Sequence, residues 1–289
     1  TAPKVQLYGD ALFLKRPGDR GTGWHTDAEH VPLDDDSFIT LWVPLQGVEA
    51  VEDGGSPLLF ADGSHNWSSR ESGGPVRITS HGPLVVGDAT AHHGRTMHAA
   101  PELGGDAHDE RWALSLSYFA SGARRVQLLR EDDEEDEERE SYQAWVDEVA
   151  LGAEARHHLL PEVPNAAVPL RQEAVQPTSE RRGACVRGTP LGQKSCHRKQ
   201  DHSEDAAVRA PGAWRLAEYQ ALLLRELDRL EEAQRLWQEM IEGKRKQLGL
   251  QHPGCLESSI VHAEMLEELG RHEDAEAILR GVMRAGCKA

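Results

Sequence analysis

The chain has 289 residues, a formal net charge of −17 and a hydrophobic content of 38%. This length allows one large or two modest domains, and the negative charge argues against a nucleic-acid partner, whose phosphates need a basic surface. No apolar run approaches the roughly 20 residues of a membrane-spanning helix, so we expect no membrane partner either.

Four cysteines lie after residue 160, too few and too scattered for the disulfide framework of a small secreted domain. We therefore expect free thiols and a reducing compartment such as the cytoplasm. The sequence begins at Thr1 without Met, so amino-terminal targeting information can be missing.

The first 122 residues carry short apolar or alternating stretches separated by Gly, Pro and Asp turn signals. This pattern predicts β-strands without intervening long helices. The predicted strands cover residues 5–14, 24–27, 37–45, 56–60, 83–86, 89–98 and 111–119. Such a series is typical of a sandwich or barrel. We predict a mainly β double-stranded β-helix, the jelly-roll or cupin-like form, in a first domain over residues 1–158.

One of these strands ends in Gly-Trp-His-Thr-Asp, where His25 and Asp27 are two residues apart. Side chains two apart on a strand point to the same face, so an imidazole and a carboxylate would meet at one point. A further imidazole, from His98, would complete three ligands on one side of a metal ion. Non-heme Fe(II) oxygenases use this arrangement. The alternative is a surface turn or an ion pair at a strand end.

The last predicted strand has two unlike faces. Arg111, Ala113, Ser115 and Ser117 share one face, while large apolar residues occupy the other. A small, polar face with one cation suits a cavity wall better than an ordinary core. The alternative is that this face points to solvent. We interpret His92 and His93 as packing residues around the candidate metal, with direct ligation as the alternative.

These motifs together resemble the phytanoyl-CoA dioxygenase family of Fe(II)/2-oxoglutarate oxygenases over residues 6–122. The matching stretches are Leu12–Gly18, Trp24–Asp27, Ile39–Leu45, Gly63–His65, Gly87–Thr90, His93-Gly94, Thr96–His98, Arg111 and Tyr118-Phe119. By this resemblance His25, Asp27 and His98 are the catalytic iron ligands. Arg111 would bind the distal carboxylate of the cosubstrate 2-oxoglutarate, in a pocket that Trp42 and Ser115 line.

The resemblance implies a dioxygenase that hydroxylates a small-molecule substrate while 2-oxoglutarate is decarboxylated to succinate. A guanidinium, a planar and permanently charged fork, suits the carboxylate contact. This chain departs from the family pattern at Arg95, Ala100 and Glu102. The family also has a helical region before its first strand, and because this sequence starts at that strand we expect this region to be absent. The alternatives are a non-catalytic protein-interaction module with a degenerate barrel, and a barrel that holds another metal for non-oxidative chemistry. The sequence does not identify the substrate.

An acidic run over residues 131–140 precedes apolar residues at helical spacing. We expect a helix over about 134–157 on the outside of the barrel, with cation binding by the run as the alternative. Residues 159–212 have the composition of a disordered linker. Cys185, Cys196, His197 and His202 lie in it, at a spacing that fits no zinc finger.

The remaining residues, 213–289, predict an all-α domain with a helical repeat, because Leu227–Ala233 recurs as Leu269–Ala275 at an offset of 42. This part resembles tetratricopeptide repeats of the kinesin light chain type, which implies a protein or peptide partner. The alternative is a helical pair that only stabilises the protein. We expect its leucine core to need nothing from the barrel, and few contacts between the two domains.

Overall fold

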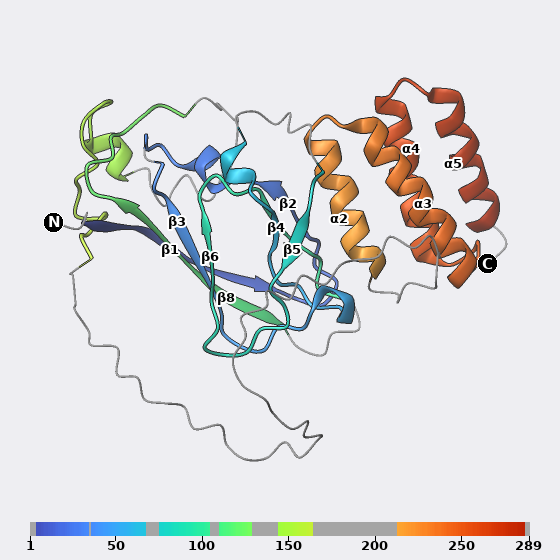
Figure 1. Ribbon diagram of the computed structural model, residues 1–289, viewed down its shortest axis with the longest axis horizontal. Helices are drawn as coiled ribbons and strands as arrows, with labels where there is room; N and C mark the ends of the chain where they lie inside the picture. Colours follow the sequence, from blue (N-terminus) through green and yellow to red (C-terminus); the bar gives the residue numbers. More distant parts are fainter. Residues whose placement is uncertain are drawn as a thin grey trace, which may run out of the picture. The chain divides into compact units, whose positions relative to one another are not determined.

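The computed structural model describes residues 4–34, 36–67, 75–104, 110–128, 144–163 and 213–286. Two antiparallel four-stranded sheets are followed by a helical region (Figure 1). The first sheet has the strand order β1-β8-β3-β6 and the second β2-β7-β4-β5. The strands are β1 Val5–Lys15, β2 Thr22–His25, β3 Ile39–Pro44, β4 Leu59–Ala61, β5 Ile78–Ser80, β6 Thr90–His93, β7 His98–Ala100 and β8 Arg111–Ala120. The predicted cupin-like β-sandwich is confirmed.

The strand predictions hold best where the apolar pattern is long. β1, β3 and β8 lie where the sequence places them. The stretch 83–86 makes only isolated bridges, Val48 with Leu84 and Val86 with Asp88, because Pro83 and Gly87 bound it closely. Residues 89–98 form two strands, not one, and β5 was not predicted.

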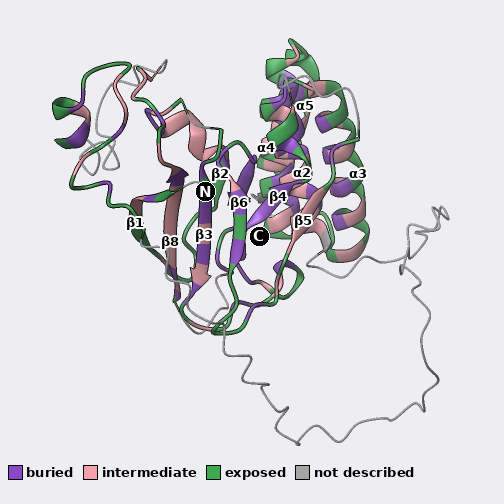
Figure 2. Cartoon of the chain, turned by 60° about the vertical axis from the view of Figure 1, so that its left-hand side comes forward, coloured by how far each residue is buried: buried purple, intermediate pink, exposed green. Residues whose placement is uncertain are grey.

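Strand β3 turns its polar and aromatic face inward. Thr40 and Trp42 are each 4% exposed, whereas Ile39 is 43% exposed. Figure 2 shows buried residues along β3. The alternation in the sequence is therefore real, but the aliphatic face is the outer one. The side chains that can do chemistry consequently face the interior of the sandwich.

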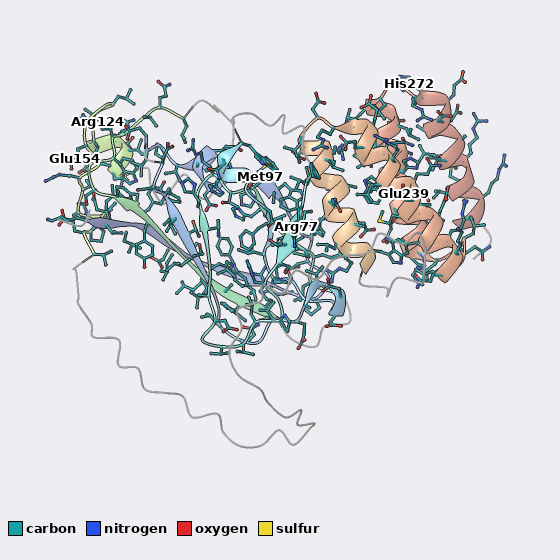
Figure 3. All side chains as sticks on the ribbon, viewed as in Figure 1. Arg77, Met97, Arg124, Glu154, Glu239 and His272 are labelled. Atoms are coloured by element: carbon teal, nitrogen blue, oxygen red, sulfur yellow. The ribbon has the colours of Figure 1, made fainter. Side chains whose placement is uncertain are left out.

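The helix predicted over 134–157 ends earlier than expected. Of its residues that the structure describes, 144–157, only 144–148 are helical. Its predicted beginning and the acidic run lie outside the described residues. Gly152, at a φ of 75°, turns the chain back, so that Glu154 pairs with Arg124 in an isolated bridge (Figure 3). Trp145 is buried and packs edge-on against Tyr8, with ring centroids 6.5 Å apart.

The start of the predicted linker at residue 159 is wrong. Leu160 is 2% exposed, and its carbonyl accepts a hydrogen bond of 2.9 Å from the Gln6 side chain. Residues up to 163 run along β1, because Leu7 N–H donates to the Pro161 carbonyl at 3.0 Å. The linker from 164 on, with Cys185 and Cys196, lies outside the described residues. Cys255 is buried and free, as expected of a structural thiol.

Two helical hairpins make up the helical region. The helices are α2 Ala213–Glu226, α3 Leu230–Leu248, α4 Pro253–Glu268 and α5 His272–Gly286. The turns inside the two hairpins each hold a residue in the left-handed conformation, Asp228 at φ 58° and Gly270 at φ 71°. Among the described residues, no helix is both long and apolar enough to cross a membrane.

The expectation of few contacts between barrel and helices is wrong. Trp24, Leu59 and Met97, on the outer face of the second sheet, form one buried cluster with Ala217 and Leu224 of α2. The reason is physical: an apolar sheet face must be covered, and the helices cover this one. The helical core therefore does not stand alone.

Candidate functional site

Two histidines face each other across neighbouring strands. His25 ends β2 and His98 begins β7, and the two residues are direct partners in the antiparallel register. Directly opposed side chains lie on the same face of a sheet, and the two ring centroids are 4.2 Å apart. The strand pairing thus brings together residues that are far apart in the sequence.

The carboxylate joins this pair by a route that the sequence did not predict. β2 ends at His25, and Asp27 is already the first residue of the short 3-10 helix η1, Asp27–His30. Thr26 between them keeps an extended conformation, with φ −122° and ψ 140°. Asp27 therefore still points to the side of His25. Ligand atoms of His25, Asp27 and His98 all lie within 4.8 Å of one another, a group that can hold a metal ion.

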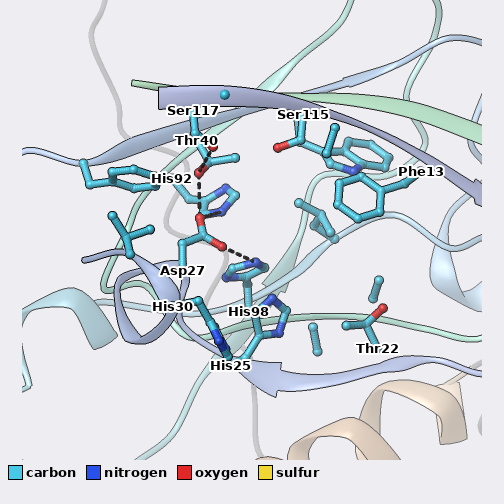
Figure 4. Close-up of a pocket in the computed structure, with 18 of the residues that line it drawn as sticks. Phe13, Thr22, His25, Asp27, His30, Thr40, His92, His98, Ser115 and Ser117 are labelled. Carbon is cyan, nitrogen blue, oxygen red and sulfur yellow. Dashed lines mark hydrogen bonds and ion pairs between the residues drawn. The ribbon is translucent and has the colours of Figure 1, made fainter. Parts of the chain in front are cut away.

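The two oxygens of Asp27 have different partners (Figure 4). Oδ2 accepts hydrogen bonds from Thr40 Oγ1 at 2.6 Å and from His92 Nε2 at 3.1 Å. Oδ1 faces Nε2 of His98 at 3.5 Å. One oxygen is thereby held in place and the other is turned toward the histidine pair, as a single-oxygen metal ligand requires.

Electrostatics keeps this carboxyl ionised. Burial alone would raise the pKa of Asp27, but the hydrogen bonds from His92 and Thr40 and the closeness of the two imidazoles hold that pKa well below its ordinary value. The carboxylate is therefore available to a cation at neutral pH.

Both ring orientations suit metal binding through Nε2. Nδ1 of His25 lies 2.9 Å from the Gly23 carbonyl, and Nδ1 of His98 lies 2.9 Å from the Thr96 carbonyl. A carbonyl only accepts, so Nδ1 carries the proton and Nε2 keeps its lone pair. Burial, with the neighbouring His25 and His92, lowers the pKa of His98 to about 4, so this ring is neutral at pH 7.

Arg111 is a buried cation for which the described residues supply no anion. It is 5% exposed, its Nε has no hydrogen-bond partner, and no described carboxylate forms an ion pair with it. Its guanidinium lies over the Trp42 ring, 5.2 Å from the centroid. Burial lowers the pKa of Arg111 to about 10, which leaves it charged at pH 7. A buried, unpaired charge is costly, so this geometry suits an anionic ligand.

All six residues predicted for the site line one cavity of about 540 Å³: His25, Asp27, His98, Arg111, Trp42 and Ser115. Thr40, His92 and Ser117 line it as well, and Tyr8, Phe13 and Phe38 add an apolar wall. The small face of β8 thus belongs to the cavity. A cavity of this size can take a cosubstrate and part of a second small molecule.

Sequence reasoning missed Thr40 and Lys15. Thr40 shares the inner face of β3 with Trp42, which was the available signal. Lys15 is 8% exposed, and its Nζ donates to the Ala100 carbonyl at 3.1 Å and to the Pro101 carbonyl at 2.6 Å. It fixes the segment that follows His98. No sequence pattern marks such a lysine, because its partners are main-chain carbonyls.

A family model matches the first part of the chain. Residues 3–108 match the phytanoyl-CoA dioxygenase (PhyH) family. The matched stretch holds His25, Asp27 and His98, and confirms the family resemblance of this part of the chain. Arg111 lies beyond it. No curated protein matches the chain.

Among solved structures, similar folds include the non-heme α-ketoglutarate-dependent epimerase SnoN from nogalamycin biosynthesis, at 24% identity and a TM-score of 0.45. The match covers 55% of this chain and 63% of that one, so the chain spans less than two thirds of this relative. The carbocyclase SnoK from the same biosynthesis matches at 20% identity and a TM-score of 0.45, over 56% of this chain and 63% of that one. AviO1 from Streptomyces viridochromogenes Tue57 matches at 23% identity and a TM-score of 0.33, over 43% of this chain and 54% of that one.

Proposed function

We propose that the barrel is an Fe(II)/2-oxoglutarate-dependent dioxygenase that oxidises a small-molecule substrate. The observation that carries this proposal is the presence, in one cavity, of a His-Asp-His group and a buried cation, Arg111, that no described carboxylate pairs with. A metal site alone would leave Arg111 unexplained. The match of residues 3–108 to the phytanoyl-CoA dioxygenase family supports the same chemistry.

Each side chain then has a role. His25, Asp27 and His98 would hold the metal, with Nε2 of each histidine and Oδ1 of Asp27 as the available ligand atoms. Arg111 receives the distal carboxylate of 2-oxoglutarate, with Trp42 stacked on the guanidinium and Ser115 beside it. Bound iron, with 2-oxoglutarate and O2, would supply the oxidation of a C–H bond together with the release of succinate.

The reaction proposed for the substrate is hydroxylation. An aspartate at position 27 fills a ligand position that a halogenating enzyme of this type would leave to a small residue. SnoN and SnoK catalyse other outcomes, epimerisation and carbocyclisation, so the product must be identified directly.

Calorimetric titration of 2-oxoglutarate under anaerobic conditions tests the proposal. Binding should be tight in the Fe(II)-loaded protein and weak in the metal-free protein, because the ligand needs both the metal and Arg111. Asp27→Ala is the control and should behave as metal-free protein. If 2-oxoglutarate binds equally well with and without Fe(II), the result would favour the alternative, a degenerate barrel that serves as an interaction module.

A second function is proposed for the helical region. Equivalent helix ends in the two hairpins, Glu226 with Glu268 and Leu230 with His272, have the same offset of 42 residues as the sequence repeat. This supports tetratricopeptide-like hairpins that bind a peptide or protein. Selection of peptides from a random library on the immobilised chain tests it, since a binding module should enrich one motif and a purely stabilising region should enrich none.

A further inference from the structure

Helix α2 holds the chain directly after the β7 metal ligand. The backbone N–H of Glu102 donates to the Tyr219 hydroxyl at 3.1 Å, and the Glu102 carbonyl accepts from Arg215 Nη2 at 2.5 Å. Both main-chain groups of this residue are therefore bound by side chains of one helix. Arg215 Nη1 also donates to the Val51 carbonyl at 3.1 Å, which ties α2 to a second point of the barrel.

The same helix holds the strand that carries the other histidine. Trp24 Nε1 donates to the main-chain carbonyl of Tyr219 at 2.9 Å, and Trp24 directly precedes His25. β2 pairs with β7 only at Thr22 and His25, with an irregular register between them. Gly23 and Trp24 thus have little support from the sheet, and α2 supplies it.

The residues before both histidines point to α2. Side chains alternate across a strand, so Trp24 and Met97 face away from the cavity while His25 and His98 face into it. Trp24 and Met97 are buried in the cluster that contains Ala217 and Leu224 of α2. One helix therefore packs against the back of the metal site at both strands.

The fit at Tyr219 is close. A Cβ at Gly21 would lie 2.2 Å from the Tyr219 hydroxyl oxygen. The hydroxyl therefore packs directly against the main chain just before β2, where only a glycine leaves room for it. Tyr219 thereby touches the beginning of β2 and the segment after β7 with a single hydroxyl. Burial raises the pKa of Tyr219 to about 12, which keeps the hydroxyl protonated.

We propose that Tyr219 and Arg215 are positioning residues of the metal centre, and that α2 fixes the separation of His25 and His98 by clamping the ends of β2 and β7. This inference rests on the proposed metal site. If the inference holds, the carboxy-terminal helices support the metal ligands indirectly, although none of their side chains lines the cavity.

The test is Co(II) affinity, read from the visible absorption of the bound ion, in the full chain. Tyr219→Phe removes only the hydroxyl and should weaken Co(II) binding about threefold, the worth of roughly one hydrogen bond. Arg215→Met combined with Tyr219→Phe removes three bonds and should weaken it more than about tenfold. The matched control is Arg225→Met, also on α2, whose partner Glu268 lies in α4. It should lower the melting temperature and leave Co(II) affinity unchanged.

The outcomes separate this inference from the function on which it rests. If the wild-type chain binds no Co(II), or binds it equally well as His98→Ala, the proposed function fails and the inference fails with it. If the wild type binds Co(II) at His98 and the folded double variant binds it equally well, the positioning role is overturned and the proposed function stands. Should the double variant not fold, Tyr219→Phe alone decides by the same comparison.

Discussion

His92 donates a hydrogen bond of 3.1 Å from Nε2 to Oδ2 of Asp27, the carboxylate of the His-Asp-His group. The side chain of His92 is 3% exposed, and its ring centroid lies 4.3 Å from that of His98, with the two ring planes tilted by 50°. His92 thus orients the carboxylate without being a member of the metal group. The sequence-based interpretation of His92 as a residue around the metal has this contact in its favour.

His92→Phe should weaken binding of Fe(II) or Co(II) while the fold is kept. Phenylalanine fills the same space but leaves Asp27 with one donor instead of two. A hydrogen bond to a charged group contributes about 1.5–3 kcal/mol, so the dissociation constant should rise roughly ten- to a hundredfold. The neighbouring His93, whose Nε2 lies against the Asp36 carbonyl, supplies the control. His93→Phe should leave metal affinity as it is, and equal losses in both variants would refute the role of His92.

Arg111→Met should weaken 2-oxoglutarate binding without lowering the stability of the fold. The variant removes a buried cation that pairs with no carboxylate in the described part of the chain, so the free energy of unfolding should stay the same or rise. The same change removes a charge-assisted and bidentate contact, and should cost about 2–4 kcal/mol of 2-oxoglutarate affinity. Metal affinity without 2-oxoglutarate should not change. A fall in stability with no change in 2-oxoglutarate binding would make Arg111 a structural residue.

Lys15 should make stability depend on pH in the alkaline range. Burial, with the charge of Arg111 next, lowers its pKa to about 7 in the folded chain, whereas an unfolded lysine titrates near 10.4. Between about pH 7 and pH 10 the unfolded chain binds the extra proton, so stability rises with pH, by up to about 1.4 kcal/mol per unit. Urea denaturation at several pH values should show this rise in the wild type and not in Lys15→Met. The exposed Lys4 supplies the control, and an unchanged slope in Lys15→Met would contradict the assignment.

The alternation of side chains along the sequence correctly predicted strands and the residues that share one face of a strand. The alternation of Ile39–Leu45 and of Arg111–Phe119 predicted two central strands, and it grouped Arg111 with Ser115 and Ser117 on the cavity wall. The two-residue spacing also placed His25 and Asp27 on one side. The strand ends at His25, but Thr26 keeps an extended conformation, so Asp27 still points to the side of His25. The candidate metal ligands could be identified from residue types because few kinds of side chain can bind a metal ion.

Long-range packing was the part that the sequence could not supply. Nothing in the leucine pattern of Ala213–Glu226 indicates that this helix covers Trp24 and Met97 instead of closing its own core. If this helix only closed its own core, a chain ending near residue 160 would keep its metal site. With Tyr219 and Arg215 bound to the barrel, we expect such a truncation to weaken metal binding.

Anaerobic absorption spectroscopy tests the central claim most directly. Fe(II) and 2-oxoglutarate are added to the full chain, and the charge-transfer band of the iron–2-oxoglutarate chelate is followed. We predict the band in the wild type, its loss in His98→Ala, and its appearance only at much higher 2-oxoglutarate in Arg111→Met. A wild-type chain that gives no band, or a band of equal strength in His98→Ala, would contradict the proposal that this cavity is an Fe(II)/2-oxoglutarate site.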